Sequence, residues 1–161
     1  MTAFDHYLHA MLLEGGEIAR ADGSATIEAH HLLLAIAAGG DPASRAALAA
    51  VGLDHDGLRA ALDGEFERSL AAVGVHVAAA DLPRPGPAPD TPRMGASTRL
   101  ALDRAFSRVA RKKDLRPAHV LLGIAAAEVG TVPRALAVAG VDRAELLAHA
   151  LAAATDGADG T

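Results

Sequence analysis

Apolar residues recur at every third or fourth position along most of the chain, which is the spacing that puts them on one face of an α-helix. In the first half this pattern predicts four helices, over about 5–21, 28–39 and 42–52 and from Asp54 onward. Asp5 is the expected N-cap of the first helix, and Asp22-Gly23 its stop. No segment shows the strict two-residue alternation of a half-buried strand. The pattern therefore predicts an all-α protein.

The second half of the chain repeats the first at an offset of 88 residues. HLLLAI, beginning at His31, returns as HVLLGI at His119, and ALAAVGLDHDGL, beginning at Ala47, lines up with ALAVAGVDRAEL at Ala135. A single ungapped register over both segments is hard to obtain by chance. The second half is therefore expected to form four more helices, with Ser97 or Thr98 capping the first of them and Pro117 in a first helical turn.

A proline-rich segment separates the two copies. DLPRPGPAPDTPR, residues 81–93, holds five of the eight prolines, and proline at alternate positions favours an extended connector over a helix. We expect a first repeat over 1–75, a linker over 76–96, a second repeat over 97–154 and a disordered tail over 155–161. The two repeats are expected to pack as one domain, because each is small for a core of its own.

Charge and composition narrow the function classes. The net charge of -5 argues against nucleic acid and membranes as partners, since both require clustered Lys and Arg. The absence of cysteine excludes disulfides and thiolate metal sites. The opening MTAFDHYLHA lacks the features of a secretory signal, so we expect a cytoplasmic protein. The chain of 161 residues also leaves no room for a nucleotide-driven motor and contains no G-x-x-x-x-G-K-[ST] phosphate loop.

The duplicated unit resembles the Clp N-terminal domain. The resemblance is carried by the Phe4-Asp5 start, the Ile-x-x-x-His-Leu-Leu-Leu-x-Ile segment over 27–36, the Ala-Leu-x-x-x-Gly-Leu-Asp segment from Ala47, and the second copies of these last two. It implies a pseudo-twofold bundle of eight helices that binds substrates, adaptors or small peptide ligands for an attached motor. Since no phosphate loop is present, we expect a free-standing Clp N-domain protein and not an unfoldase.

The resemblance implies a binding function without catalysis. We expect a peptide- or protein-binding module that acts as an adaptor, competitor or ligand-sequestering decoy for Clp unfoldase–protease machinery. Its expected partners are Clp ATPase or protease components and substrate or cyclic peptides, with no cofactor. Two alternatives from other classes stay open: a small helical enzyme or sensor that uses a metal or its histidines, and a helical dimeric regulator.

The resemblance also indicates candidate ligand-binding residues. In the family, the starts of the first and fifth helices meet and line a groove, which implies roles for Phe4, Tyr7, Met94 and Arg99. Glu28 and His30, next to the histidine motif, complete the candidate set.

One departure from the family pattern affects the choice of ligand. In the ClpC branch a glutamate before each motif histidine resembles part of a phosphoarginine site, in which a carboxylate holds the guanidinium. This chain has His30 and Ala118 instead, and Ala29 and Pro117 where the family has a small hydroxyl residue. We therefore expect such a site to be weak or absent, with Glu28 close enough to substitute in part.

Other polar clusters have structural explanations. His31 and His119 lie at equivalent helix starts, which favours roles as caps or core residues. A metal site built from His30, His31, His119 and Glu28 lacks the i, i+4 spacing of helical zinc ligands, so no metal ligand is expected. No serine lies in a nucleophile motif, so no catalytic residue is expected either. The basic residues over 108–116 either complement the end of the fifth helix or form a docking patch for an acidic partner.

Overall fold

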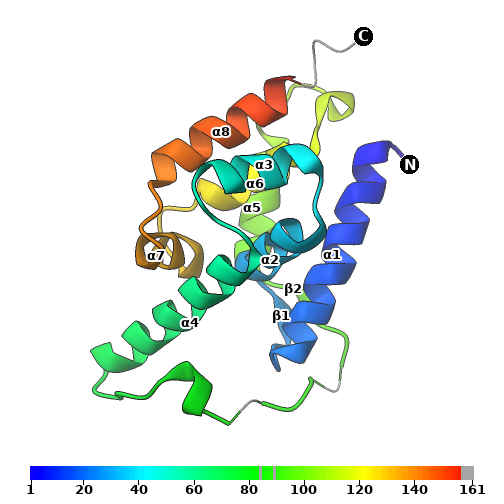
Figure 1. Cartoon of the computed structure of the whole chain (residues 1–161). Helices are drawn as coiled ribbons and strands as arrows, with labels where there is room; N and C mark the ends of the chain where they lie inside the picture. Colours follow the sequence, from blue (N-terminus) through cyan, green and yellow to red (C-terminus); the bar gives the residue numbers. More distant parts are fainter. Residues whose placement is uncertain (84, 89, 157–161) are drawn as a thin grey trace.

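The computed structural model describes residues 1–83, 85–88 and 90–156, which form eight α-helices, two single 3-10 turns and two very short strands (Figure 1). The first half contains α1 (Ala3–Ala21), β1 (Thr26–Ile27), α2 (Ala29–Gly39), α3 (Pro42–Ala50) and α4 (His55–Ala72). The connection contains η1 (Ala79–Asp81) and β2 (Arg93–Met94). The second half contains α5 (Ala96–Phe106), η2 (Lys112–Asp114), α6 (Pro117–Ala125), α7 (Thr131–Val138) and α8 (Arg143–Thr155). The predicted all-α class is confirmed.

The two halves repeat the same four-helix unit, as the 88-residue offset predicts. Gly52 and Gly140 end the third helix of each half with φ values of 75° and 71°, a left-handed conformation that favours glycine. Asp54 and Asp142 then cap the fourth helix of each half through their side chains. The duplication is therefore present in the turns as well as in the helices.

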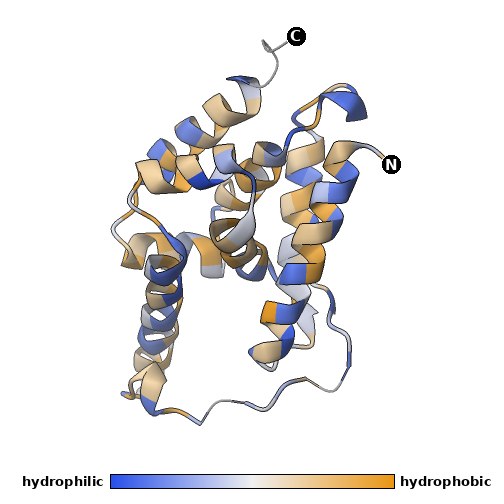
Figure 2. Ribbon diagram, turned by 45° about the vertical axis from the view of Figure 1, so that its right-hand side comes forward, coloured by the Kyte–Doolittle hydropathy of each residue, from blue (hydrophilic) through white to orange (hydrophobic). Residues whose placement is uncertain are grey.

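Helices of the two halves pack against one another. α3 packs on α8, α4 on α7, and α2 on both α5 and α6. The central helices α2 and α6 are apolar on nearly every side, so both are almost wholly buried (Figure 2). Their fully buried side chains include Leu32, Leu33, Leu34, Ile36, Val120, Leu121, Leu122 and Ile124. The two repeats therefore share one core.

The proline-rich connection runs from the end of α4 back to the end of α1 (Figure 1). There the backbone N–H of Ala88 donates to the carbonyl of Arg20 at 3.1 Å, and the Arg20 side chain donates to the carbonyl of Ala88 at 3.2 Å. β2 then pairs with β1 in parallel, through two residues on each strand. Strands this short have no periodic pattern, so the sequence did not predict them.

Three details of the helix ends differ from expectation. The N-cap of α1 is Thr2 and not Asp5, which instead completes a capping box: its N–H donates to the Thr2 hydroxyl at 3.1 Å and its carboxylate accepts from the Thr2 N–H at 2.9 Å. Gly95 is the N-cap of α5, so Ser97 and Thr98 lie inside the helix. The predicted tail over 155–161 starts on the last residue of α8, and 157–161 lie outside the described residues.

Candidate functional site

The starts of α2 and α5 cap each other across the two repeats. The hydroxyl of Ser97 accepts from the backbone N–H of Ala29 at 2.8 Å, which satisfies a free donor of the first turn of α2. In return, the carboxylate of Glu28 accepts from both the hydroxyl and the N–H of Ser97. Beside this joint, the hydroxyl of Thr98 donates to the carbonyl of Ile27 at 2.7 Å. The two hydroxyls therefore tie one repeat to the other instead of capping their own helix.

Glu28 is fully engaged in this joint. One carboxylate oxygen accepts from Ser97 and the other from the hydroxyl of Thr26 at 2.8 Å. Burial opposes ionisation of Glu28, but the hydrogen bonds from Ser97 and Thr26 outweigh it and hold the pKa below its usual value. A ligand guanidinium would have to compete with these donors for the carboxylate.

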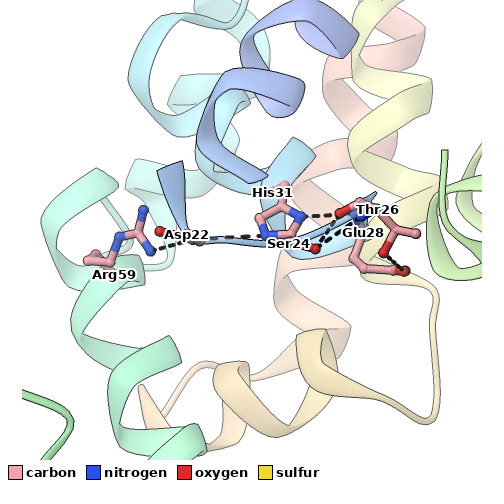
Figure 3. A network of polar contacts seen from close by, with 6 residues as sticks. All are labelled: Asp22, Ser24, Thr26, Glu28, His31 and Arg59. Carbon is pink, nitrogen blue, oxygen red and sulfur yellow. Dashed lines mark hydrogen bonds and ion pairs between the residues drawn. The ribbon is translucent and has the colours of Figure 1, made fainter. Parts of the chain in front are cut away.

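A chain of polar contacts leads from this joint to α4 (Figure 3). The Nδ1 atom of His31 accepts from the N–H of Glu28 at 2.9 Å, and its Nε2 atom lies 3.9 Å from the carboxylate of Asp22 at the end of α1. Asp22 in turn accepts from Arg59 of α4 at 3.1 Å. Burial lowers the pKa of His31 to about 4, and the adjacent His30 acts in the same direction. His31 is therefore a neutral, buried helix cap.

His119 has the same role in the second repeat. Its Nδ1 atom accepts from the N–H of Arg116 at 2.8 Å, and its side chain is buried. Both motif histidines thus use a ring nitrogen for helix capping. Within the described residues, no group of three or more His, Cys, Asp or Glu side chains is arranged to hold a metal ion.

An open cleft of about 260 Å³ lies next to the joint, between the starts of α2, α5 and α7. Its walls are partly apolar, through Leu100, Val129 and Val132, and Val129 is 86% exposed on the rim. Polar groups from three helices complete the lining: Glu28, His30, Ser97, Arg104, Thr131 and Arg134. The cleft therefore combines an apolar surface with groups of both charges and with hydroxyls.

Arg134 of the cleft is held in place by an ion pair. Nε of Arg134 donates to the carboxylate of Glu65 at 2.9 Å, and Ser69 donates to the same oxygen at 2.7 Å. Glu65 is buried, which disfavours its charge, but Arg134 and Ser69 outweigh the burial and keep its pKa below the usual value. In the part of the chain that the structure describes, the Arg134 side chain donates hydrogen bonds only through its Nε. Its terminal amino groups are available to a ligand carbonyl or carboxylate.

His30 adds a neutral polar group. Burial lowers its pKa, which Glu28 and Asp22 oppose only in part. Its ring centroid lies 4.1 Å from that of His31. At neutral pH the cleft therefore offers an imidazole that accepts or donates one hydrogen bond.

The fold is shared with a solved structure. The chain superposes on the N-terminal domain of the caseinolytic protease associated chaperone ClpD from Arabidopsis thaliana with a TM-score of 0.60, covering 93% of this chain and 95% of that one, at 20% sequence identity. The chain has a Clp N-domain fold. The expected pseudo-twofold bundle of eight helices is confirmed. No protein-family model and no curated protein matches the sequence. No helix among the described residues is long and apolar enough to cross a bilayer.

In this Clp N-domain fold the six candidate residues do not come together. Glu28 and His30 line the cleft. Phe4 is 6% exposed and stacks edge to face on Phe106, with ring centroids 6.3 Å apart. The start of α1 therefore lies beside the end of α5 and not beside its start, so the expected meeting of the two helix starts is not observed.

The remaining candidates are spread over three elements. Tyr7 is half-buried against the core, and burial, together with the charge of Asp41, raises the pKa of its hydroxyl. Met94 of β2 is half-buried against the core, and Arg99 lies exposed on α5. None of these three side chains lines the cleft.

The α7 side of the cleft was not predicted from the sequence. Val129, Thr131 and Arg134 follow α6 in an unremarkable stretch, and the partner of Arg134, Glu65, lies 69 residues away. No local motif joins residues so far apart in the chain. Only the packing of α4 on α7 brings them together.

Proposed function

We propose that the chain is a non-enzymatic peptide- or protein-binding module of Clp N-domain type. In this proposal it acts in the cytoplasm as an adaptor, competitor or ligand-sequestering decoy for Clp unfoldase–protease machinery. The observation that carries the proposal is the open, chemically mixed cleft between α2, α5 and α7, on a fold shared with the N-domain of a Clp-protease-associated chaperone.

The cleft suits a short peptide segment. A cavity of about 260 Å³ accepts one or two side chains and not a large cofactor. An apolar ligand side chain packs on Leu100, Val129 and Val132, while the ligand backbone bonds to Arg134 and Thr131. We propose that Glu28 and His30 contribute to ligand binding by forming the wall of this cleft at the start of α2.

The polar groups at the joint support binding over catalysis. The hydroxyl of Ser97 is bonded to Glu28 and to the N–H of Ala29, and it makes no hydrogen bond with His30 among the described residues. A serine nucleophile requires a base within hydrogen-bond reach, usually a histidine. Ser97 instead has the contacts of a structural residue.

A free binding module affects a machine by mass action. If the chain binds the same peptides as a Clp unfoldase, it lowers their free concentration, and it is half occupied when the free ligand equals its dissociation constant. If it binds the machine itself, it either competes with substrates for the machine or delivers substrates to it. Both modes require the same cleft to be accessible.

A peptide array tests the proposal. The purified chain is applied to an array of random ten-residue peptides, next to two variants of an exposed valine, Val129→Glu in the cleft and Val73→Glu beyond the end of α4. Val73 is 78% exposed, so the two changes are matched in chemistry and exposure. We expect Val129→Glu to lower the affinity for these peptides by about tenfold or more, since it places a charge against an apolar ligand side chain.

The control decides the interpretation. Val73→Glu is expected to bind the same peptides as the unchanged chain within about twofold, because surface changes away from a site have small effects. Equal loss in both variants, or no peptide bound by the unchanged chain, would contradict the proposal. Circular dichroism of each variant shows that it is folded.

A further inference from the structure

The loop between α5 and α6 has a charge opposite to that of the molecule. Arg108, Arg111, Lys112, Lys113 and Arg116 lie within nine residues, in a chain with a net charge of -5. Both lysines of the chain are among them. We refer to residues 107–116 as the basic loop. It is the hydrophilic segment near the N-terminus in Figure 2.

Complementing the end of α5 does not account for these cations. α5 ends at Phe106, and the basic residue of its last turn is Arg104. Arg111 pairs with Asp114 at 3.0 Å, and Arg116 donates to the carbonyls of Lys113 and Leu115. Among the described residues, none of the five charged side chains donates to a carbonyl of the last turn of α5; only the backbone N–H of Arg108 does so, to Ala105.

The basic loop, which follows the end of α5, also lies at the starts of two other helices. The amino group of Lys112 lies 3.0 Å from the carboxylate of Asp5 in the first turn of α1, and Arg116 is the N-cap of α6. Helix N-termini carry a partial positive charge, so these cations add to an existing positive potential. Burial lowers the pKa of His119; the backbone contact with Arg116 opposes this in part, and the charges of Arg116 and Arg108 act in the same direction as burial. An anion is the natural complement of such a region.

The cations are exposed and only partly neutralised. Two of them, Arg111 and Lys112, pair with carboxylates, and their side chains are still 66% and 68% exposed. Arg108 and Lys113 are exposed and form no ion pair within the described residues. At the edge of the loop, Phe106 is 42% exposed and is held in place by its contact with Phe4. The surface therefore offers unpaired cations next to a fixed aromatic ring.

We propose that the basic loop and Phe106 form a docking surface for an acidic polypeptide segment that carries an apolar side chain among its Asp and Glu residues. Its carboxylates bind Arg108 and Lys113, and its apolar side chain packs on Phe106. A nucleic acid fits less well, because its phosphates extend past a patch of this size onto a molecule of net negative charge. The docking surface begins at Phe106, the last residue of α5, and shares no lining residue with the cleft, which Ser97, Leu100 and Arg104 of α5 line.

Fluorescence anisotropy of a labelled peptide, Glu-Asp-Leu-Glu-Glu-Asp-Leu-Glu, tests the docking surface. We expect binding in 50 mM KCl that weakens steadily as the salt rises to 300 mM, because ion pairs at an exposed surface are screened. The double variant Arg108→Gln/Lys113→Gln is expected to bind about fivefold more weakly or worse. The matched control Arg45→Gln/Arg68→Gln, which removes two exposed arginines of α3 and α4, is expected to stay within about twofold.

Phe106→Ala tests the apolar half of the surface. This substitution is expected to weaken binding of the acidic peptide. It is not expected to weaken binding of the same peptide with both leucines replaced by glutamine. Circular dichroism establishes that each variant is folded. Because Arg108 and Lys113 form no ion pair in the described part of the chain, their replacement is not expected to lower the melting temperature.

Four results would overturn the proposal. The first is that the labelled peptide does not bind in 50 mM KCl, and the second is that both double variants weaken its binding equally. The third is that a peptide with glutamine in place of every Asp and Glu binds equally well. The fourth is that a single-stranded oligonucleotide of equal charge binds more tightly to the same residues. Val129→Glu in the cleft is expected to leave this binding unchanged. The proposed function is therefore tested by Val129→Glu, and the docking surface by the variants of Arg108, Lys113 and Phe106, so either proposal can fail without the other.

Discussion

At the scale of the residue, His31 and His119 show how the duplication is preserved. Each accepts a hydrogen bond from the backbone N–H three residues earlier, Glu28 in one half and Arg116 in the other. This contact requires an unprotonated Nδ1 atom, which burial favours by lowering both pKa values. Protonation of these two histidines at low pH therefore removes both caps and destabilises the fold.

The pH dependence of stability tests this role. The pKa of His31 is about 4 in the folded chain and 6.5 in the unfolded one, so between these values the unfolded state binds more protons. The stabilisation is complete above about pH 6.5 and is lost as the pH falls toward 4. We expect the free energy of unfolding, measured with urea, to decline over this interval.

A conservative variant isolates His31 from the other titrating groups. Glutamine at the third position of a helix can accept the same backbone hydrogen bond but does not titrate near neutral pH. We therefore expect a shallower decline between pH 6.5 and 4.5 for His31→Gln, and an unchanged decline for His149→Gln at an exposed position of α8. Parallel curves for the unchanged chain and His31→Gln would contradict the role given to His31.

Single residues of the candidate site were predictable only near a motif. Glu28 and His30 were found because they adjoin the histidine that marks the start of α2, and both line the cleft. Arg134 was not found, because its position depends on an ion pair with a residue on another helix. Ser97 was expected to cap its own helix, but its hydroxyl contacts the partner repeat instead.

At the scale of the element, the close contact of α5 with α6 depends on a residue without a side chain. A Cβ atom built on Gly123 of α6 would overlap the carbonyl oxygen of Ala101 and lie 3.1 Å from the backbone nitrogen of Ala105. Both neighbours belong to the backbone of α5, so neither can turn away as a side chain would. The two helices must move apart to accept any other residue.

Two glycine-to-alanine changes test this contact. Gly123→Ala is expected to lower the free energy of unfolding by about 1–3 kcal/mol or more, because overpacking shifts the backbone of both helices. Gly39→Ala, at the last residue of α2, meets nothing within 4 Å and is expected to be neutral or to stabilise by up to about 1 kcal/mol. Urea unfolding measures both, and equal effects would show that the α5–α6 contact is not limiting.

The helices themselves were largely predictable, and their ends were less so. Apolar periodicity located α1 to α4, and the repeat transferred them to the second half. The start of α1 was placed two residues late, since Asp5 is typical of both an N-cap and the third helical position. The β1–β2 pairing was missed, because two residues do not make a pattern.

At the scale of the whole molecule, the two repeats pack into a single structural unit. Helices of one repeat pack against helices of the other. The hydrogen bonds between Glu28 and Ser97 hold the start of α2 against the start of α5. The cleft is completed by α7, which α4 of the first repeat holds in place through Glu65 and Arg134. A single four-helix unit would lack this cleft. The duplication is therefore what creates the proposed binding site.

The most direct test of this account is capture of partners from the host lysate with the purified chain as bait, quantified by mass spectrometry. The matched baits are Val129→Glu in the cleft, Val73→Glu as a folded control, and Leu33→Asp as an unfolded control. We predict that the unchanged chain and Val73→Glu enrich Clp ATPase or protease components, or their substrates, and that Val129→Glu and Leu33→Asp do not. The same proteins on all four baits, or no enrichment of this set by the unchanged chain, would contradict the account.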